Sequence, residues 1–405
     1  MMRSIELFAG AGGLAIGTHD AGFRTSVIIE RDSDTCMTIR TNQSRGFAPM
    51  AHAQLFDRDV QLFDYAPLQG AIDFISGGPP CQPFSMGGKH RGYQDTRDMF
   101  PEAVRAVREL QPQAFLFENV KGLTRESFAK YFGYIQLQLT YPDIVRRDDE
   151  PWIEHLARLE QHHTSGSEEG LLYRVVYRLV NAADYGVPQR RERVFIVGFR
   201  SDIHQAWSFP EATHTQEALL YHQWRSQNYW EQHQIPQKAR PAIPEKVAAR
   251  VARLKIDPAV MKLPWATIRD AIYDLPDPQT ATDKAILNHE YRSGARTYKG
   301  HTGSPLDEPA KALKAGDHGV PGGENMVVYP HGSIRYFTVR ESARLQGFPD
   351  EYLFPVSWTE SMRQLGNAVP VELGYKVASS IATALERAAR EGEAVQPIGQ
   401  AQFRN

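Results

Sequence analysis

Short apolar runs recur along the first 200 residues, and segments with helical spacing lie between them. Runs of this length that are apolar on both faces are typical of buried strands in a parallel sheet. The predicted strands are residues 3–8, 25–29, 71–76, 114–117, 173–180 and 194–199. Strands that alternate with helices predict an α/β fold with a doubly wound, mostly parallel sheet.

The regular pattern stops near residue 200 and returns near residue 336. The intervening chain is rich in aromatic residues, proline and glycine, and long loops of this kind favour a second, smaller domain. After Thr338 the spacing predicts a helix, and a longer amphipathic helix follows. The expected organisation is a first domain over 1–200 with an insertion at 142–170, a second domain over 201–335, a return to the first over 336–390, and a flexible tail over 391–405.

The composition resembles that of an ordinary soluble protein, since 41% of the 405 residues are hydrophobic and 23% are charged. The formal net charge of −2 argues against a protein that coats nucleic acid without specificity, but it allows a local basic cleft. Residues 238–262 carry many lysines and arginines against only Glu245 and Asp257. This segment fits either a solvated helix face or a face that contacts phosphates.

Two further features bear on cofactors and on location. Cys36 and Cys81 are the only cysteines, which excludes a disulfide framework and a zinc site built from cysteines, so we expect no metal. The chain begins without an apolar leader, and no apolar run approaches the length of a membrane span. We therefore expect a cytoplasmic protein that does not contact a membrane.

The segment 77–85, Gly-Gly-Pro-Pro-Cys-Gln-Pro-Phe-Ser, follows the predicted strand at 71–76. Its prolines forbid both a helix and a continuing β-ladder, so the thiol of Cys81 is held on a stiff loop. In an open α/β sheet, ligands bind at the carboxyl ends of the strands. Cys81 is therefore a candidate nucleophile, and a small buried packing residue is the alternative.

A glycine turn follows the first predicted strand. Gly10, Gly12 and Ala15 satisfy the GxGxxG/A pattern, and Glu30 follows Gly10 by twenty residues, where a carboxylate can bind a ribose. The pattern fits any adenosine cofactor, either a nicotinamide dinucleotide or S-adenosylmethionine, and a plain tight turn explains it as well. Asp59 fits either an acceptor for an adenine amino group or a solvated loop residue.

Other charged residues lie at the ends of predicted strands. Glu118 follows the strand at 114–117 and so lies at the same sheet edge as Cys81. The segment Gln189 to Arg193 carries several arginines, which fit either a solvated turn or planar donors to an anion or a base edge. Residues 86–99 combine glycines with cations, which favours a lid that attracts phosphates over a plain surface loop.

Taken together, these motifs resemble those of the DNA (cytosine-5)-methyltransferases of bacterial restriction-modification systems. They occur in that family's order and cover roughly residues 1–200 and 336–385. The matching stretches are Phe-Ala-Gly-Ala-Gly-Gly at 8–13, Pro-Pro-Cys-Gln-Pro-Phe-Ser at 79–85, Glu-Asn-Val at 118–120, Gln-Arg-Arg-Glu-Arg at 189–193, Arg-Glu through Gln-Gly-Phe-Pro at 340–349, and Gly-Asn-Ala-Val-Pro at 366–370. The resemblance implies a Rossmann-like methyltransferase domain with a smaller target-recognition domain.

The resemblance also implies a mechanism. Cytosine C5 is too weak a nucleophile to attack a methyl sulfonium, so a thiolate first adds to C6, and Cys81 is expected to supply it. Glu118 is expected to act as the acid at N3. Arg193 and Arg191 are expected to hold the O2 atom of the base and to stabilise the developing charge. The base that removes the C5 proton is not identified, and water can serve.

The expected cofactor is S-adenosyl-L-methionine, with S-adenosyl-L-homocysteine as the product. By resemblance, Phe8 contacts the adenine face, Gly10 and Gly13 lie near the methionine moiety, Glu30 binds the ribose, Asp59 lies near the adenine amine, and Pro80, Asn367 and Val369 complete the pocket. The sequence departs from the family at Arg31, where an aromatic residue often follows the ribose glutamate. The resemblance therefore does not imply adenine stacking on that side.

The expected substrate is a specific sequence in double-stranded DNA. The target cytosine must leave the duplex to reach Cys81, and Gln82, Ser85 and Arg97 are candidate DNA contacts on the loop after it. Residues 201–335 are expected to read the flanking bases in the major groove. We expect a monomer that protects host DNA from a cognate restriction or other anti-phage system acting on the same site.

Other functions fit parts of the pattern. A nicotinamide-dependent dehydrogenase explains the glycine turn and Glu30, but it has no use for Cys81 with Glu118 and Arg193. An RNA (tRNA) cytosine-5 methyltransferase uses the same chemistry, but its recognition domain is usually smaller than the segment 201–335. A non-catalytic DNA-binding regulator does not need the chemical residues that are present.

Overall fold

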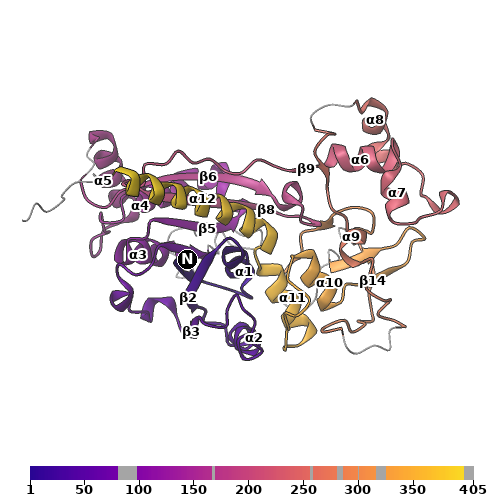
Figure 1. The fold of residues 1–405 in the computed structure, drawn as a ribbon, viewed down its shortest axis with the longest axis horizontal. Helices are drawn as coiled ribbons and strands as arrows, with labels where there is room; N and C mark the ends of the chain where they lie inside the picture. The colour runs from indigo at the N-terminus through magenta and orange to yellow at the C-terminus, as the bar shows by residue number, and fades with distance from the viewer. Residues whose placement is uncertain are drawn as a thin grey trace, which may run out of the picture.

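The computed structural model describes residues 1–80, 98–166, 169–255, 259–280, 286–299, 301–315 and 325–395, without the side chains of 392–395. A large sheet lies at one end of the molecule, and α6, α7 and α8 lie at the other, with α10 and α11 between them (Figure 1). No helix in the described ranges is both long enough and apolar enough to cross a membrane.

The sheet is mostly parallel, as predicted. Across it, the strands are β3 (Gln54–Phe56), β2 (Phe23–Ile29), β1 (Met2–Leu7), β4 (Phe74–Gly77), β5 (Ala114–Val120), β8 (Glu192–Arg200) and β6 (Tyr173–Asn181). The five strands from β3 to β5 run parallel, whereas β8 is antiparallel to both β5 and β6. The order reverses direction at β1 and β4, and ligands bind at such switch points.

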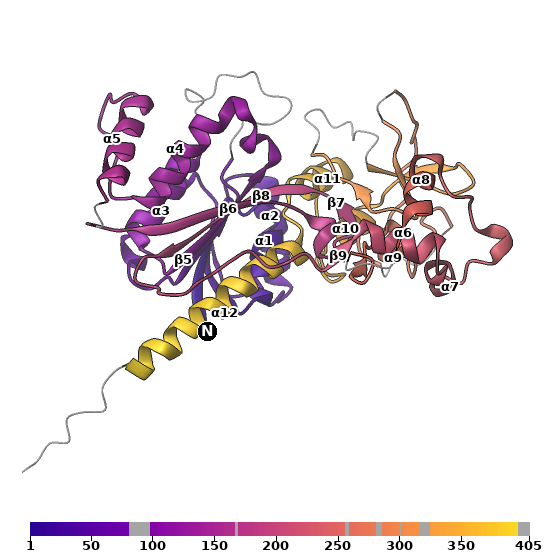
Figure 2. The same cartoon turned by 90° about the horizontal axis from the view of Figure 1, so that it is seen from above.

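Helices cover both faces of the sheet, which confirms the doubly wound α/β class (Figure 2). Phe115 and Phe117 of β5 pack on one face with α3 and α4, whereas Leu116 packs on the other with α1 and α12. Successive side chains of a strand point to opposite faces, so an apolar run buries both. The helices of this layered part are α1 (Gly13–Asp20), α2 (Ser33–Ser44), α3 (Phe100–Leu110), α4 (Ala129–Thr140), α5 (Trp152–Ser165) and α12 (Val371–Val395).

The insertion at 142–170 contains α5. It packs on α4 through a small apolar cluster that includes Tyr134 and Leu159. His155 is buried, and its two ring nitrogens lie 2.7 Å from the Tyr134 hydroxyl and 2.7 Å from the Ile144 carbonyl oxygen. Because this cluster is separate from the main cores, the insertion extends the molecule without forming part of the sheet.

The segment after β8 does not continue the large sheet. Its strands form only two- and three-stranded sheets in the described residues. Trp230, Leu219 and Tyr229 form its own apolar cluster. The elements are β9 (His214–Thr215), α6 (Gln216–Trp224), α7 (Asn228–Gln232), α8 (Glu245–Arg253), β10 (Leu263–Pro264), α9 (Ile268–Ile272), β11 (Ser304–Pro305), β12 (Ala310–Lys311), β13 (Met326–Val328) and β14 (Ile334–Tyr336). Strand β12 pairs with β7 (Gln189–Arg190), which precedes β8. The proposed domain boundaries remain predictions.

The chain then returns to the sheet through α10 (Val339–Leu345), α11 (Trp358–Asn367) and α12. The Thr338 cap is present as a capping box with Glu341. Helix α11 extends through Asn367, so the matched stretch at 366–370 begins in a helix. The first residues of the expected tail are also helical, because α12 continues to Val395; residues 396–405 lie outside the described ranges.

Helices α1 and α12 approach each other closely at two glycines of α1. A Cβ atom on Gly13 would lie 2.2 Å from the Val369 carbonyl oxygen, and one on Gly17 would lie 2.6 Å from that of Val371. Neither position can hold a larger residue without moving backbone. This contact brings residues near the start of the chain against the turn that precedes α12.

Candidate active site

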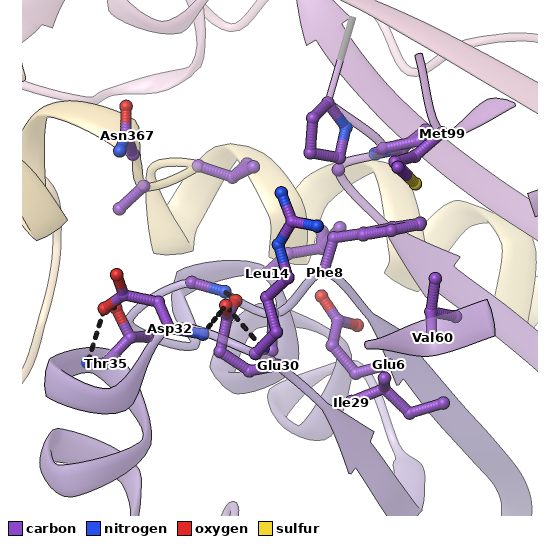
Figure 3. Close-up of a pocket in the computed structure, with 18 of the residues that line it drawn as sticks. Glu6, Phe8, Leu14, Ile29, Glu30, Asp32, Thr35, Val60, Met99 and Asn367 are labelled. Atoms are coloured by element: carbon purple, nitrogen blue, oxygen red, sulfur yellow. Dashed lines mark hydrogen bonds between the residues drawn. The ribbon is translucent and has the colours of Figure 1, made fainter. Parts of the chain in front are cut away.

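A cavity of about 350 Å³ opens at the carboxyl ends of β1, β2, β4 and β5. Figure 3 shows Glu6, Phe8 and Val60 on one side of it and Glu30, Asp32 and Thr35 on the other. Most residues predicted to bind a cofactor line it, namely Phe8, Gly10, Glu30, Asp59, Pro80, Asn367 and Val369. Gly13 is not a lining residue, but its backbone lies against the carbonyl oxygen of Val369, which does line the cavity.

The glycine turn fixes the Glu30 carboxylate. Gly10 has a φ of 54° and Gly12 a φ of 83°, backbone conformations that glycine adopts without strain. In this turn the Gly10 amide donates to Glu30 Oε2 at 2.8 Å, while Glu30 Oε1 accepts from the amides of Arg31 and Asp32, each at 2.9 Å. Because a carboxylate has about four acceptor positions and three are used by these amides, Glu30 can still accept a hydrogen bond from a ribose hydroxyl.

Arg31 and Asp59 form the rim of the cavity. The Arg31 guanidinium lies 2.9 Å from Asp59 Oδ2, and the Gln61 amide donates to Asp59 Oδ1 at 3.0 Å. The amide hydrogen bond, with the smaller effect of Arg31, holds the pKa of Asp59 below its ordinary value. The residue that departs from the family pattern thus pairs with the carboxylate predicted to lie near the adenine.

A buried ion pair lies beside this cavity. Arg193 Nε of β8 is 2.7 Å from Glu118 Oε1 of β5, and the two side chains are only 14% and 10% exposed. Because Val120 of β5 pairs with Arg193 of the antiparallel β8, the side chains of Glu118 and Arg193 lie close together. Burial raises the pKa of the Glu118 carboxyl, although the charges of Arg193 and Arg191 oppose that rise. Burial therefore favours the protonated form of this carboxyl, which is the form that can donate a proton.

The backbone before Cys81 is anchored to the same strand. Asn119 Nδ2 donates to the Pro79 carbonyl oxygen at 2.9 Å, and the Met99 amide donates to that of Pro80 at 3.0 Å. A Cβ atom on Gly78 would lie 3.5 Å from Glu118 Oε2. The segment that leads into the predicted nucleophile therefore lies against Glu118. The predicted site residues Cys81, Gln82, Ser85 and Arg97 lie outside the described residues.

Arg191 has a different environment from Arg193. It is 1% exposed, and its guanidinium donates to the carbonyl oxygens of Leu313 at 3.0 Å and Gly366 at 2.6 Å. Burial lowers its pKa, and Arg193 adds to this effect. The sequence interpretation grouped the two arginines at the base, but the structure gives Arg191 backbone partners from two distant segments.

Sequence reasoning missed Glu6 and Asn119. Glu6 lines the cavity, is 1% exposed and accepts a hydrogen bond from the Ser76 hydroxyl. A carboxylate in an apolar strand was a usable signal, because acids are rarely buried without a partner. The sequence signal for Asn119 was weaker, because its side chain donates to a backbone carbonyl oxygen and every residue has one. No group of His, Cys, Asp and Glu side chains suited to a metal occurs in the part of the chain that the structure describes.

The burial of Glu6 predicts a pH-dependent stability. Burial raises its pKa from 4.5 to about 8, so between these values the unfolded chain is ionised and the folded protein keeps the proton. Stability is therefore expected to fall as the pH rises from about 4.5 to 8, by up to roughly 4 kcal/mol. Glu6→Gln mimics the protonated acid and should remove this loss, as measured by urea unfolding at pH 5 and pH 8.

The exposed Glu126 offers the control, because Glu126→Gln should leave the pH dependence unchanged. If Glu6→Gln and the unmodified protein lose equal stability between the two pH values, Glu6 is ionised in the folded state and the explanation is wrong.

Comparisons with known proteins agree with these features. A family model described as C-5 cytosine-specific DNA methylase matches residues 2–140 and 156–383, and the gap between the two matched ranges overlaps the first part of the insertion. The type II methyltransferase M.NgoMIV of Neisseria gonorrhoeae is 30% identical over 388 residues, covering 95% of this chain and 98% of the relative. The type II methyltransferase M.Eco47II of Escherichia coli is 29% identical, covering 95% and 79%.

The fold also resembles solved structures. The Dnmt2 methyltransferase of S. pombe superposes with a TM-score of 0.55 at 16% identity, covering 96% of this chain and 99% of that structure. At this level of identity the likeness concerns the fold alone, and it supports the assignment of the sheet and helices to a methyltransferase architecture.

Proposed function

Because this chain belongs to the family of C-5 cytosine-specific DNA methylases and is a DNA (cytosine-5)-methyltransferase of the restriction-modification type, we propose which of its residues perform the reaction. The cavity at the ends of β1 and β2 binds S-adenosylmethionine. Cys81, Glu118 and Arg193 activate the cytosine. The observation that carries this proposal is the buried Glu118–Arg193 pair, which lies against the segment that ends in Cys81.

The residues of the cavity fit the proposed cofactor. Phe8 and Val60 offer apolar surface for an adenine, Glu30 offers a fixed carboxylate for the ribose, and Asp59 offers an acceptor for the adenine amine. The amides at the start of α1 favour a negatively charged group such as a carboxylate. The bound cofactor supplies an electrophilic methyl group on a sulfonium.

The chain's own residues prepare the base. The Cys81 thiolate forms a bond to C6, and the displaced electron pair makes C5 nucleophilic while N3 takes a proton from Glu118. Arg193 donates to O2 and stabilises negative charge on the ring. After C5 is methylated, N3 returns its proton to Glu118 and a base removes the C5 proton. The electron pair of that C–H bond forms the double bond between C5 and C6, the bond from C6 to sulfur breaks, and Cys81 leaves as a thiolate.

We further propose that the target cytosine is flipped out of duplex DNA, at a cost of a few kcal/mol. Residues 201–335 read the flanking bases, and Gln82, Ser85 and Arg97 contact the DNA. The protein acts as a monomer in the cytoplasm, without a metal, and protects DNA against a cognate restriction or other anti-phage system. The relatives' type II designation supports this setting.

Tritiated S-adenosylmethionine tests the reaction and the acceptor together. The purified protein is incubated with unmethylated duplex DNA, with bulk tRNA or without acceptor, and the DNA product is sequenced after bisulfite treatment. Label is expected in the DNA alone, at C5 of cytosines within one short sequence. Label in tRNA but not in DNA would contradict the recognition role of residues 201–335, and label at another atom would contradict the chemistry.

A further inference from the structure

Three alternate side chains, which run from Gln189 of β7 through Arg191 to Arg193 of β8, point to the same side of the chain. Gln189 and Arg191 are 0% and 1% exposed, and Arg193 is 14% exposed in its pair with Glu118. The intervening Arg190 and Glu192 are more exposed, at 38% and 47% of their side chains. This alternation follows from the two-residue period of extended chain.

Arg191 joins two segments that lie far from it in the sequence. One of its terminal nitrogens donates to the Leu313 carbonyl oxygen and the other to that of Gly366. Leu313 follows β12 and lies within the predicted recognition segment 201–335. These two segments also touch directly, since a Cβ atom on Gly366 would lie 2.3 Å from the Ala315 amide nitrogen.

Gly366 lies in the last turn of α11, directly before residues that line the cofactor cavity. We call residues 366–369 the cofactor turn, because Asn367, Ala368 and Val369 all line that cavity. The side chain of Gln346 supports the turn by donating to the carbonyl oxygens of Leu365 and Ala368. The position of the turn therefore depends on side chains that reach its backbone from outside.

Gln189 completes the connection. Its Oε1 accepts from the Leu313 amide at 3.0 Å, and its Nε2 lies 3.2 Å from Gln346 Oε1. The amide of Leu313 is thus held by Gln189 and its carbonyl by Arg191. Buried polar networks of this kind fix one arrangement of the backbone when their members are paired.

We propose that Arg191 is a positioning residue that ties the cofactor turn to Leu313 and to the strand that carries Arg193. The inference rests on the proposed function, because it assumes that the cavity binds S-adenosylmethionine. Both terminal nitrogens of Arg191 donate to carbonyl oxygens, so Arg191 acts through the cofactor turn. Arg193 alone faces the base. Losing Arg191 should then weaken cofactor binding more than it slows the chemical step.

Binding of S-adenosylhomocysteine, measured by calorimetry without DNA, tests this role. Arg191→Met keeps much of the side-chain volume but removes both donors, and we expect the dissociation constant to rise about tenfold or more. Arg191→Lys keeps a cation that can still donate, although without the fixed fork of arginine, and about a threefold rise is expected. The matched control is Arg190→Met, which should bind within about twofold of the unmodified protein.

The second measurement is the single-turnover rate of methyl transfer with cofactor and DNA both saturating. This rate should stay within about threefold of the unmodified protein in the Arg191 variants. A rate about 100-fold lower with an unchanged dissociation constant would show that Arg191 acts on the base, and the positioning role would be overturned. If Arg191→Met does not fold, Arg191→Lys decides, because unchanged S-adenosylhomocysteine binding by that variant contradicts the proposal.

These outcomes separate the inference from the proposed function. The calorimetric comparison needs no nucleic acid, so it stays readable even if no acceptor is methylated. An unmodified protein that does not bind S-adenosylhomocysteine would overturn the proposed cofactor site and the positioning role together.

Discussion

Replacing Glu118 with glutamine is expected to lower the single-turnover rate of methyl transfer by about 10²–10³-fold. The amide has nearly the same shape, but it cannot transfer a proton to N3 as the thiolate adds to C6. It also replaces the carboxyl that lies 2.7 Å from Arg193 Nε in the unmodified protein. The rate should be measured with excess enzyme and saturating cofactor, with the folded state verified by circular dichroism.

The Glu118→Gln variant should also differ from the unmodified enzyme in how its methyl-transfer rate depends on pH. Because burial raises the pKa of Glu118 above its ordinary value of 4.5, the protonated acid persists to higher pH and is lost as the pH rises through the raised pKa. The unmodified enzyme should therefore slow on the alkaline side of that pKa, and Glu118→Gln should lack this decline.

Glu192→Gln is the matched control for this experiment. Glu192 lies next to Arg193 in the sequence, but it is 47% exposed and pairs with Lys121 at the surface. Its replacement should leave the rate almost unchanged. A Glu118→Gln enzyme that transfers methyl groups as fast as the Glu192→Gln enzyme would remove Glu118 from the mechanism.

Cys81→Ala should abolish turnover, with a loss of more than about 10⁴-fold, because without a thiolate C5 stays too weak a nucleophile. The dissociation constant of S-adenosylhomocysteine should change little, since the cavity is formed by other residues. A duplex with 5-fluorocytosine at the target site gives a direct readout. Fluorine at C5 cannot be removed as a proton, so the protein–DNA adduct persists in denaturing gels.

The second cysteine provides the comparison. Cys36 is buried in α2, its Sγ lies 3.3 Å from the Glu30 carbonyl oxygen, and burial raises its thiol pKa to about 12. Such a thiol is not ionised at neutral pH. Cys36→Ala should therefore keep the adduct that Cys81→Ala loses. An adduct that survives Cys81→Ala would assign the nucleophile elsewhere.

The sheet was predictable because the burial of a strand determines which types of side chain it contains. Strands buried on both faces need uninterrupted apolar residues, as in Phe115 to Phe117, and the turns between strands and helices need glycine, as at Gly10. The antiparallel direction of β8 was not predictable in this way. Direction depends on which edge a strand joins, and its apolar pattern is the same in either orientation.

The cavity was predictable where side chains themselves provide its chemistry. Phe8, Glu30 and Asp59 lie around one cavity, as the motifs indicated. The role of Arg191 was not accessible in the same way. Its partners are the backbone carbonyls of Leu313 and Gly366, and every residue has a carbonyl, so no residue type in the sequence identifies them.

The contact of α1 with the cofactor turn also affects when the protein becomes competent during its synthesis. The cavity takes one wall from Phe8 to Leu14 and another from Asn367 to Val369, so the two are separated by most of the chain. A ribosome produces the first wall long before the second, and contacts of such sequence separation form late in folding. A nascent chain should thus be unable to hold the methyl donor until residue 369 has emerged from the ribosome.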